Sequence, residues 1–231
     1  MWIYLLGIVG ELVLLGILSS RLTQLSFTVL LHLTRSRSVA ITILTIILFP
    51  GTVIHELSHL FTAEILGVRT GKLTLVPESI EGNEVQSGSV AIAKTDPFRR
   101  TAIGIAPTIT GVTTISALSY VLFLLPHSLL SALTHEVLIF VIFYLILAIS
   151  NTMFSSHEDM NGVIPVAVTL ALVTAASYLS GLTVAIPTNI QVFLATVALS
   201  LVKNLGIALA VNLLVTLVHV LFIALLKKQA R

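Results

Sequence analysis

The sequence lacks cysteine, and charged residues make up only 10% of its 231 positions. Without cysteine the chain forms neither disulfides nor thiolate metal sites, so any metal ion must be held by His, Asp or Glu. A soluble domain carries about 25% charged residues, whereas this chain is 56% hydrophobic and has a mean hydropathy of +1.08. The composition predicts an all-α polytopic membrane protein that lies mostly in the lipid bilayer.

The few charges leave a net charge of only +2. Lys and Arg stand in short clusters between apolar segments, without a basic stripe interleaved with aromatic residues, so we assign no nucleic-acid partner. The first residues, Met1–Tyr4, contain no basic residue, and the apolar segment after them is expected to remain as an uncleaved first span. Residues 1–231 are therefore expected to form a single integral membrane domain.

Runs of roughly 20 apolar residues predict about six transmembrane helices. Their approximate bounds are 2–19, 39–66, 102–125, 136–150, 163–179 and 205–226. Residues 25–33 are too few for a comfortable span and are assigned to the membrane interface. Residues 190–203 form either an interfacial helix or an extension of the last span. Pro50 and Gly51 interrupt the second span, which predicts a kink or local unwinding there.

Most of the polar sequence lies between the second and third spans. Gly67 stands where a glycine commonly ends a helix. Residues 68–76 and 87–93 alternate loosely and are rich in β-branched side chains, which predicts a membrane-associated β-hairpin at about 68–93. Asp96-Pro97 is a typical helix start, with Asp at the cap and Pro in the first turn.

Six spans would put both termini on the same side of the membrane as the hairpin. That side would hold eight basic residues, and the other side four. The eight are Arg69, Lys72, Lys94, Arg99, Arg100, Lys227, Lys228 and Arg231, and the four are Arg21, Arg35, Arg37 and Lys203. The positive-inside rule then predicts cytoplasmic termini, in a plasma or inner membrane.

The second span contains the sequence His55-Glu56-Leu57-Ser58-His59. Two His four positions apart project from one face of a helix and can hold one metal ion. The Glu beside them can deprotonate a metal-bound water. Because a carboxylate and two imidazoles are costly in hydrocarbon, the motif predicts a functional site, with a pair of hydrogen-bonded core histidines as the alternative.

A catalytic zinc site usually needs a third protein ligand. A polar segment directly after a span offers His157, Glu158 and Asp159. Glu64 lies about 140° around the helix from His59 and cannot reach the same ion. The carboxylates of the hairpin are more simply solvated loop charges, and they are Glu78, Glu81 and Glu84.

Three more polar residues lie in apolar spans. Glu11 is in the first span, and Asn212 and His219 share one face of the last. Polar contacts between helices explain all three more simply than a water path or a second metal site.

The segment Phe49–His59, with Ala63 and Gly67-Val68 after it, resembles the site-2 protease family of intramembrane zinc metalloproteases. Arg99–Pro107 is similar to the opening of the family's third span, although Ala106 stands where the family usually has Gly.

A second part of the resemblance comes later in the chain. Asn151 precedes Asp159 by eight residues, the interval of the family's Asn-to-Asp motif. The resemblance covers about residues 45 to 165. It departs from the pattern at Phe154, where Pro is common, and at 160–162, where the Gly does not follow the Asp directly.

The resemblance implies that His55, His59 and Asp159 hold Zn²⁺ and that Glu56 is the catalytic base. It also implies that Asn151 steadies a substrate strand or the loop that carries Asp159. The implied substrate is a membrane-spanning protein, which must unwind locally because a helix hides its carbonyl groups. The hairpin is a candidate to receive the unwound segment by strand addition.

Two other classes of function stay open. An inactive, binding or regulatory membrane protein is favoured by the altered sequence around Asp159. A metal transporter is a weaker alternative, since transport sites usually draw ligands from several spans. The sequence predicts no oligomeric state.

Overall fold

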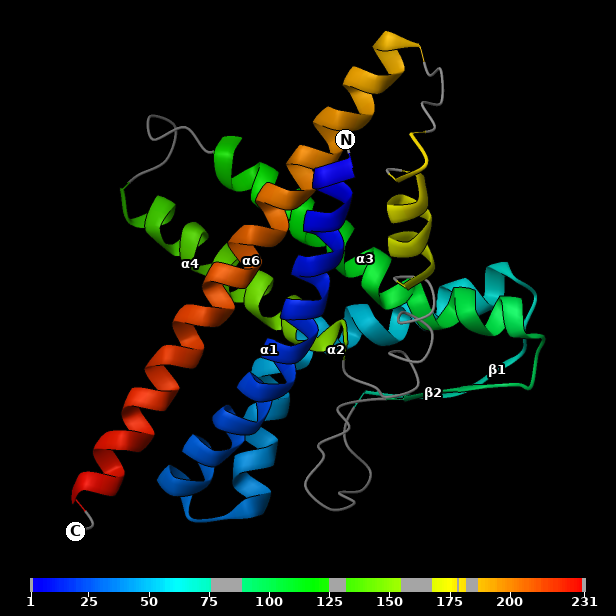
Figure 1. The fold of residues 1–231 in the computed structure, drawn as a ribbon. Coiled ribbons are helices and arrows are strands. Elements are labelled where there is room, and N and C mark those ends of the chain that lie inside the picture. The colour runs from blue at the N-terminus through cyan, green and yellow to red at the C-terminus, as the bar shows by residue number, and fades with distance from the viewer. Residues whose placement is uncertain are drawn as a thin grey trace.

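The computed structural model describes residues 2–75, 89–124, 132–154, 168–177, 179–181 and 187–229. Its long helices are α1 (Trp2–Thr34), α2 (Arg37–Ile65), α3 (Pro97–Leu124), α4 (Ala132–Thr152) and α6 (Thr188–Gln229), shown in Figure 1. All five are long and apolar enough to cross a membrane, and a shorter apolar helix covers Val168–Ser177. The predicted all-α polytopic membrane fold is therefore confirmed at this level.

The helices extend beyond the predicted spans. α1 continues through residues 25–33, which form no separate interfacial segment, and α6 includes residues 190–203 as an extension of the last span. Of the predicted span 163–179, the structure describes mainly the helix Val168–Ser177. Hydropathy identifies only the part of a helix that suits the hydrocarbon layer. Exposed charged residues such as Arg21 and Lys203 interrupt the apolar run but not the helix.

α2 remains helical across Pro50. Figure 1 shows that its blue N-terminal part and its cyan C-terminal part run in different directions, so the predicted kink is present and the predicted unwinding is absent. The helix ends as expected, because Gly67 has a φ of +67°. The N–H groups of Gly67 and Val68 donate to the carbonyl oxygens of Glu64 and Ala63, at 3.0 and 2.9 Å.

Strands β1 (Thr70–Thr74) and β2 (Ser89–Ile92) pair antiparallel between α2 and α3, within the predicted hairpin. The sheet is joined to α2, because the Thr70 hydroxyl donates to Glu64 Oε1 at 2.6 Å. α3 begins at Pro97, and the Arg99 N–H donates to Asp96 Oδ1 at 3.0 Å. This hydrogen bond, with the nearby Arg99 charge, holds the pKa of Asp96 below its ordinary value.

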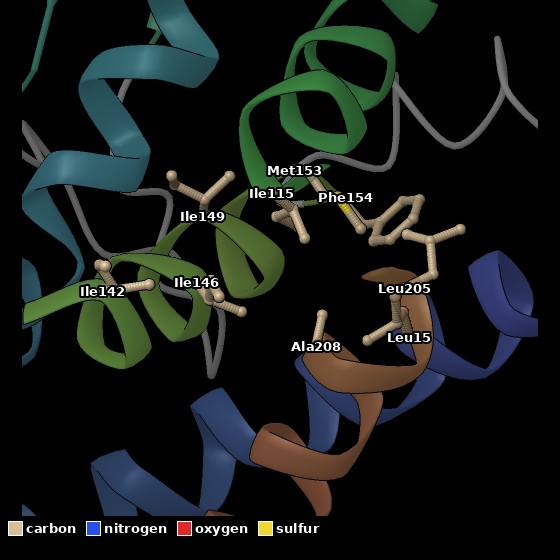
Figure 2. Close-up of a cluster of buried hydrophobic side chains, with 9 residues drawn as sticks. All are labelled: Leu15, Ile115, Ile142, Ile146, Ile149, Met153, Phe154, Leu205 and Ala208. Carbon is tan, nitrogen blue, oxygen red and sulfur yellow. The ribbon is translucent and has the colours of Figure 1, made fainter. Parts of the chain in front are cut away.

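A buried cluster joins four helices around α4. Figure 2 shows its side chains gathered where α4 meets α1, α3 and α6, with three Ile from α4 on one side and the residues of α1 and α6 on the other. The members are Leu15, Ile115, Ile142, Ile146, Ile149, Met153, Phe154, Leu205 and Ala208. The core therefore forms where α4 crosses the other helices.

α1 packs most extensively against α6, and the two helices run in the same direction. A Cβ atom on Gly7 would lie 3.5 Å from Val202 Cγ2, and Ser26 Oγ lies 3.3 Å from His219 Nε2, so contacts advance along both helices together. Figure 1 places the two chain ends at opposite ends of this pair. The side of the membrane on which each terminus lies stays a prediction.

Candidate metal and catalytic site

The His55 and His59 rings converge on one face of α2. Their Nε2 atoms lie 3.2 Å apart, and their ring centroids are 4.8 Å apart with an interplanar angle of 85°. Two nitrogens that each bind a tetrahedral zinc ion at about 2.0–2.1 Å are separated by about 3.3–3.4 Å. This separation is close to that of a zinc site, as the i, i+4 spacing predicts. It is also a hydrogen bond between the two rings, as the alternative of hydrogen-bonded core histidines predicts.

The orientation of the His59 ring is set by a neighbouring helix. His59 Nδ1 lies 2.9 Å from the carbonyl oxygen of Ile103 in α3. A carbonyl oxygen only accepts, so Nδ1 carries the proton and donates it to Ile103. In the neutral ring, Nε2 then keeps its lone pair on the side that faces His55. Metal-binding histidines are commonly held by such a bond from the other ring nitrogen.

The motif is enclosed by protein. The exposed fractions of His55, Glu56 and His59 are 4%, 3% and 8%. Gly51, one turn before His55, is crossed closely by α4: a Cβ atom there would overlap Thr152 Oγ1 and the Ala148 carbonyl oxygen. The C-terminal end of α4 therefore meets α2 about 6 Å along the helix axis from His55.

The predicted third ligand, Asp159, and the alternatives His157 and Glu158 lie outside the described residues. Among the residues that are described, no group of three His, Asp or Glu side chains is arranged to hold a metal ion. Phe154, the last described residue before Asp159, is 6% exposed and belongs to the central core. The polar segment that contains Asp159 thus follows the end of α4, which is held in the core and lies beside α2.

Asn151 stands at the end of α4 and is held by the middle of another helix, α6. Its Nδ2 group donates to Asn212 Oδ1 at 2.7 Å and to the Leu147 carbonyl at 2.8 Å, while Asn212 Nδ2 donates to Ser150 Oγ at 2.7 Å. The prediction that Asn212 makes polar contacts between helices is confirmed. The described contacts of Asn151 belong to this α4–α6 connection, and its role toward substrate or the Asp159 loop stays a prediction.

Asn151 also borders a cavity of about 150 Å³ between α1, α2, α4 and α6. The lining is mostly apolar and includes Ser26 and His219, whose side chains contact each other. His219 Nδ1 lies 2.7 Å from the Val215 carbonyl, so the ring donates there and accepts from Ser26. His219 is thus used in a contact between helices, as predicted.

Glu64 is exposed and accepts a hydrogen bond from Thr70, on a different side of α2 from the His pair. Its exclusion as a ligand is consistent with this position. Ile103 is the contributor that side-chain patterns miss, because it acts through its backbone carbonyl. Asn212 was visible as a polar residue in an apolar helix, but its partner Asn151 lies 61 positions away.

Comparison with known proteins finds no family model, no curated protein and no solved structure that matches the chain.

Proposed function

We propose that this protein is an intramembrane zinc endopeptidase of the site-2 protease type, which cleaves membrane-anchored polypeptides. The observation that carries the proposal is the pair of converging imidazoles, with Nε2 atoms 3.2 Å apart and a buried Glu56 between them in sequence. The bond from His59 to Ile103 adds support, because it directs the lone pair of His59 Nε2 toward His55, where an ion would replace the hydrogen bond between the rings. His55, His59 and Asp159 would hold the ion.

Bound zinc would act as a Lewis acid toward the scissile carbonyl and would make water easier to deprotonate. Glu56 is the proposed general base, which accepts a proton from water and delivers it to the leaving amine. Its burial suits this role, because protein walls keep competing bulk water away from the reacting groups. The carboxylate stands next to His55 in sequence, and the helix holds both on a rigid backbone.

The proposed substrate is a transmembrane segment that unwinds before it is cut. The two-stranded sheet leaves the outer edge of each strand without a described strand partner, and such an edge can pair with an extended peptide. The sheet begins at Thr70, five residues after α2 ends at Ile65, and the Thr70–Glu64 bond fastens it there. A substrate strand on the sheet would therefore lie near the helix that carries Glu56.

The membrane assignment rests on the five long apolar helices. A plasma or inner membrane remains the proposed location. The parallel packing of α1 and α6 favours termini on opposite sides, in place of two cytoplasmic termini.

Glu56→Gln separates binding from catalysis. We expect this variant to retain zinc, because the His pair is unchanged, and to lose peptide cleavage by about 100-fold or more. Zinc content is measured on the purified protein, and cleavage is measured with a single-span reporter in vesicles. Glu136→Gln is the matched control, because it makes the same change at an exposed position near the start of α4.

Three outcomes distinguish the alternatives. Loss of zinc in His55→Ala and His59→Ala, with loss of cleavage in Glu56→Gln, supports the protease. A wild-type protein that binds zinc but cleaves none of a broad reporter panel favours an inactive binding protein. A wild-type protein that binds no zinc contradicts the proposal at its base.

A further inference from the structure

α3 contains a proline well inside the helix. Pro107 is the eleventh residue of α3, which begins at Pro97, and it is almost fully buried. A proline has no N–H group, so the carbonyl four residues earlier loses its usual partner within the helix. For Pro107 that carbonyl belongs to Ile103. An unpaired carbonyl is costly in hydrocarbon unless another donor reaches it.

The donor that reaches the Ile103 carbonyl is the ring of His59. The Nδ1 atom of His59 lies 2.9 Å from that oxygen. The Ile103 side chain is 2% exposed and packs with Ala63 and Val68, which belong to the last turn of α2 and the residues just after it. Both the carbonyl and the imidazole are therefore held in place by the same contact between α2 and α3.

We propose that Pro107 is a positioning residue for the metal site: it withholds a backbone N–H from the Ile103 carbonyl and thereby reserves that oxygen for His59. The hydrogen bond keeps the proton of the His59 ring on Nδ1 and aims Nε2 toward His55. This inference rests on the metal-binding half of the proposed function and needs neither a protein substrate nor proteolysis.

Pro107→Ala is the direct test. Alanine supplies the missing N–H, so the backbone competes with His59 for the Ile103 carbonyl. Loss of a hydrogen bond that orients a ligand typically costs about 10–100-fold in metal affinity, and we expect zinc to bind more weakly by that factor. Affinity is measured on the full chain in nanodiscs, by competition with a chelator of known affinity.

The stability of the metal-free protein distinguishes positioning from a general structural role. Proline is the least favourable residue in a helix interior, and alanine is the most favourable. We therefore expect the thermal midpoint of metal-free Pro107→Ala to stay level or rise while its zinc affinity falls. A residue that only shapes the fold would move both in the same direction.

Pro97→Ala is the matched control. Pro97 is the first residue of the same helix, where the missing N–H would have no partner within the helix in any case. We expect its zinc affinity to equal that of the wild type. Pro107→Gly supplies the same N–H without a side chain, and it replaces the alanine variant if that variant fails to fold.

A spectroscopic measurement reports on the ring itself. With ¹⁵N-labelled histidine, the metal-free wild type should show a His59 signal protonated at Nδ1, assigned by its absence in His59→Gln. In Pro107→Ala we expect this signal to shift toward a mixture of tautomers. Equal zinc affinity in Pro107→Ala and wild type overturns the inference, as does equal weakening by Pro97→Ala. Absence of zinc from the wild type would instead remove the proposed function.

Discussion

The α1–α6 pair and the α2–α3–α4 group differ in the regularity of their helices. α1 and α6 are long and contain no internal proline, and they contact each other in parallel over much of their length. α2 and α3 each contain a buried or partly buried internal proline, at Pro50 and Pro107. The pair is built from regular helices, whereas the group departs from regularity at the positions that flank the His pair.

The two regions also differ in the partners of their side-chain hydrogen bonds. In the pair, Ser26 and His219 contact each other across the helices, and the described residues that line the cavity beside them include no carboxylate and no second imidazole. In the group, a carbonyl released by proline accepts from a candidate metal ligand. Irregular backbone next to buried polar side chains therefore distinguishes the proposed functional region better than polarity alone.

The largest effect is expected from a substitution at Gly51, where α2 and α4 pack closely. In Gly51→Ala the new Cβ would meet Ala148 and Thr152, with the Ala148 carbonyl carbon at 2.7 Å, so α4 must move. We expect a loss of about 1–3 kcal/mol in the free energy of unfolding and weaker zinc binding. Unfolding in a denaturing detergent and chelator competition measure the two effects.

Gly7→Ala is the matching change in the regular pair. Its Cβ would make an ordinary contact, 3.5 Å from Val202, and alanine favours a helix. We expect unchanged zinc binding and stability that is equal or slightly higher. A loss as large as that of Gly51→Ala would show that close packing is not specific to the group.

Asn212 joins the two regions, and its removal tests how strongly they depend on each other. Asn212→Leu loses the bonds to Asn151 and Ser150. Since polar bonds between membrane helices average about 0.6 kcal/mol, we expect a loss of about 1 kcal/mol. Chelator competition should also detect weaker zinc binding, because Asn151 stands near the end of α4.

Ser26→Ala breaks a bond that stays within the α1–α6 pair. We expect a smaller loss of stability and no change in zinc affinity. If Ser26→Ala and Asn212→Leu alter zinc affinity equally, the two regions do not behave separately.

The smallest effect is expected at Asp96, which is exposed at the start of α3. Its pKa is lowered by the Arg99 N–H and then by the Arg99 charge, so its carboxylate stabilises the fold above the ordinary pKa of an aspartate. That contribution is lost as the pH falls through the lowered pKa. Asp96→Asn should flatten this acid dependence, which thermal unfolding between neutral and acid pH would reveal.

The sequence predicts the local features well. The His pair, the glycine at the end of α2 and the Asp96-Pro97 helix start each depend on spacing within one or two helical turns, and all three occur. The limits of the spans are less accurate, because hydropathy identifies the part of a helix that suits lipid and not the point where the helix ends.

Contacts between distant segments could not be predicted in the same way. The direction of α6 relative to α1 depends on packing, and the Ile103 carbonyl carries no side-chain signal. Pro107 was visible in the sequence. The histidine that binds the carbonyl left unpaired by Pro107 is on another helix. Such pairings need the three-dimensional arrangement, because many alternative pairs satisfy the same composition.

The pairing of α1 with α6 also sets an order for assembly. The contact between Ser26 and His219 spans 193 positions. At about 5–20 residues per second, a ribosome needs about 10–40 s to make the chain between them. α2, α3 and α4 are synthesised during that interval, so the helices of the proposed metal site can meet before α6 emerges. α1 therefore remains in the membrane without its principal partner until α6 is made, and α6 then completes the packing around α1.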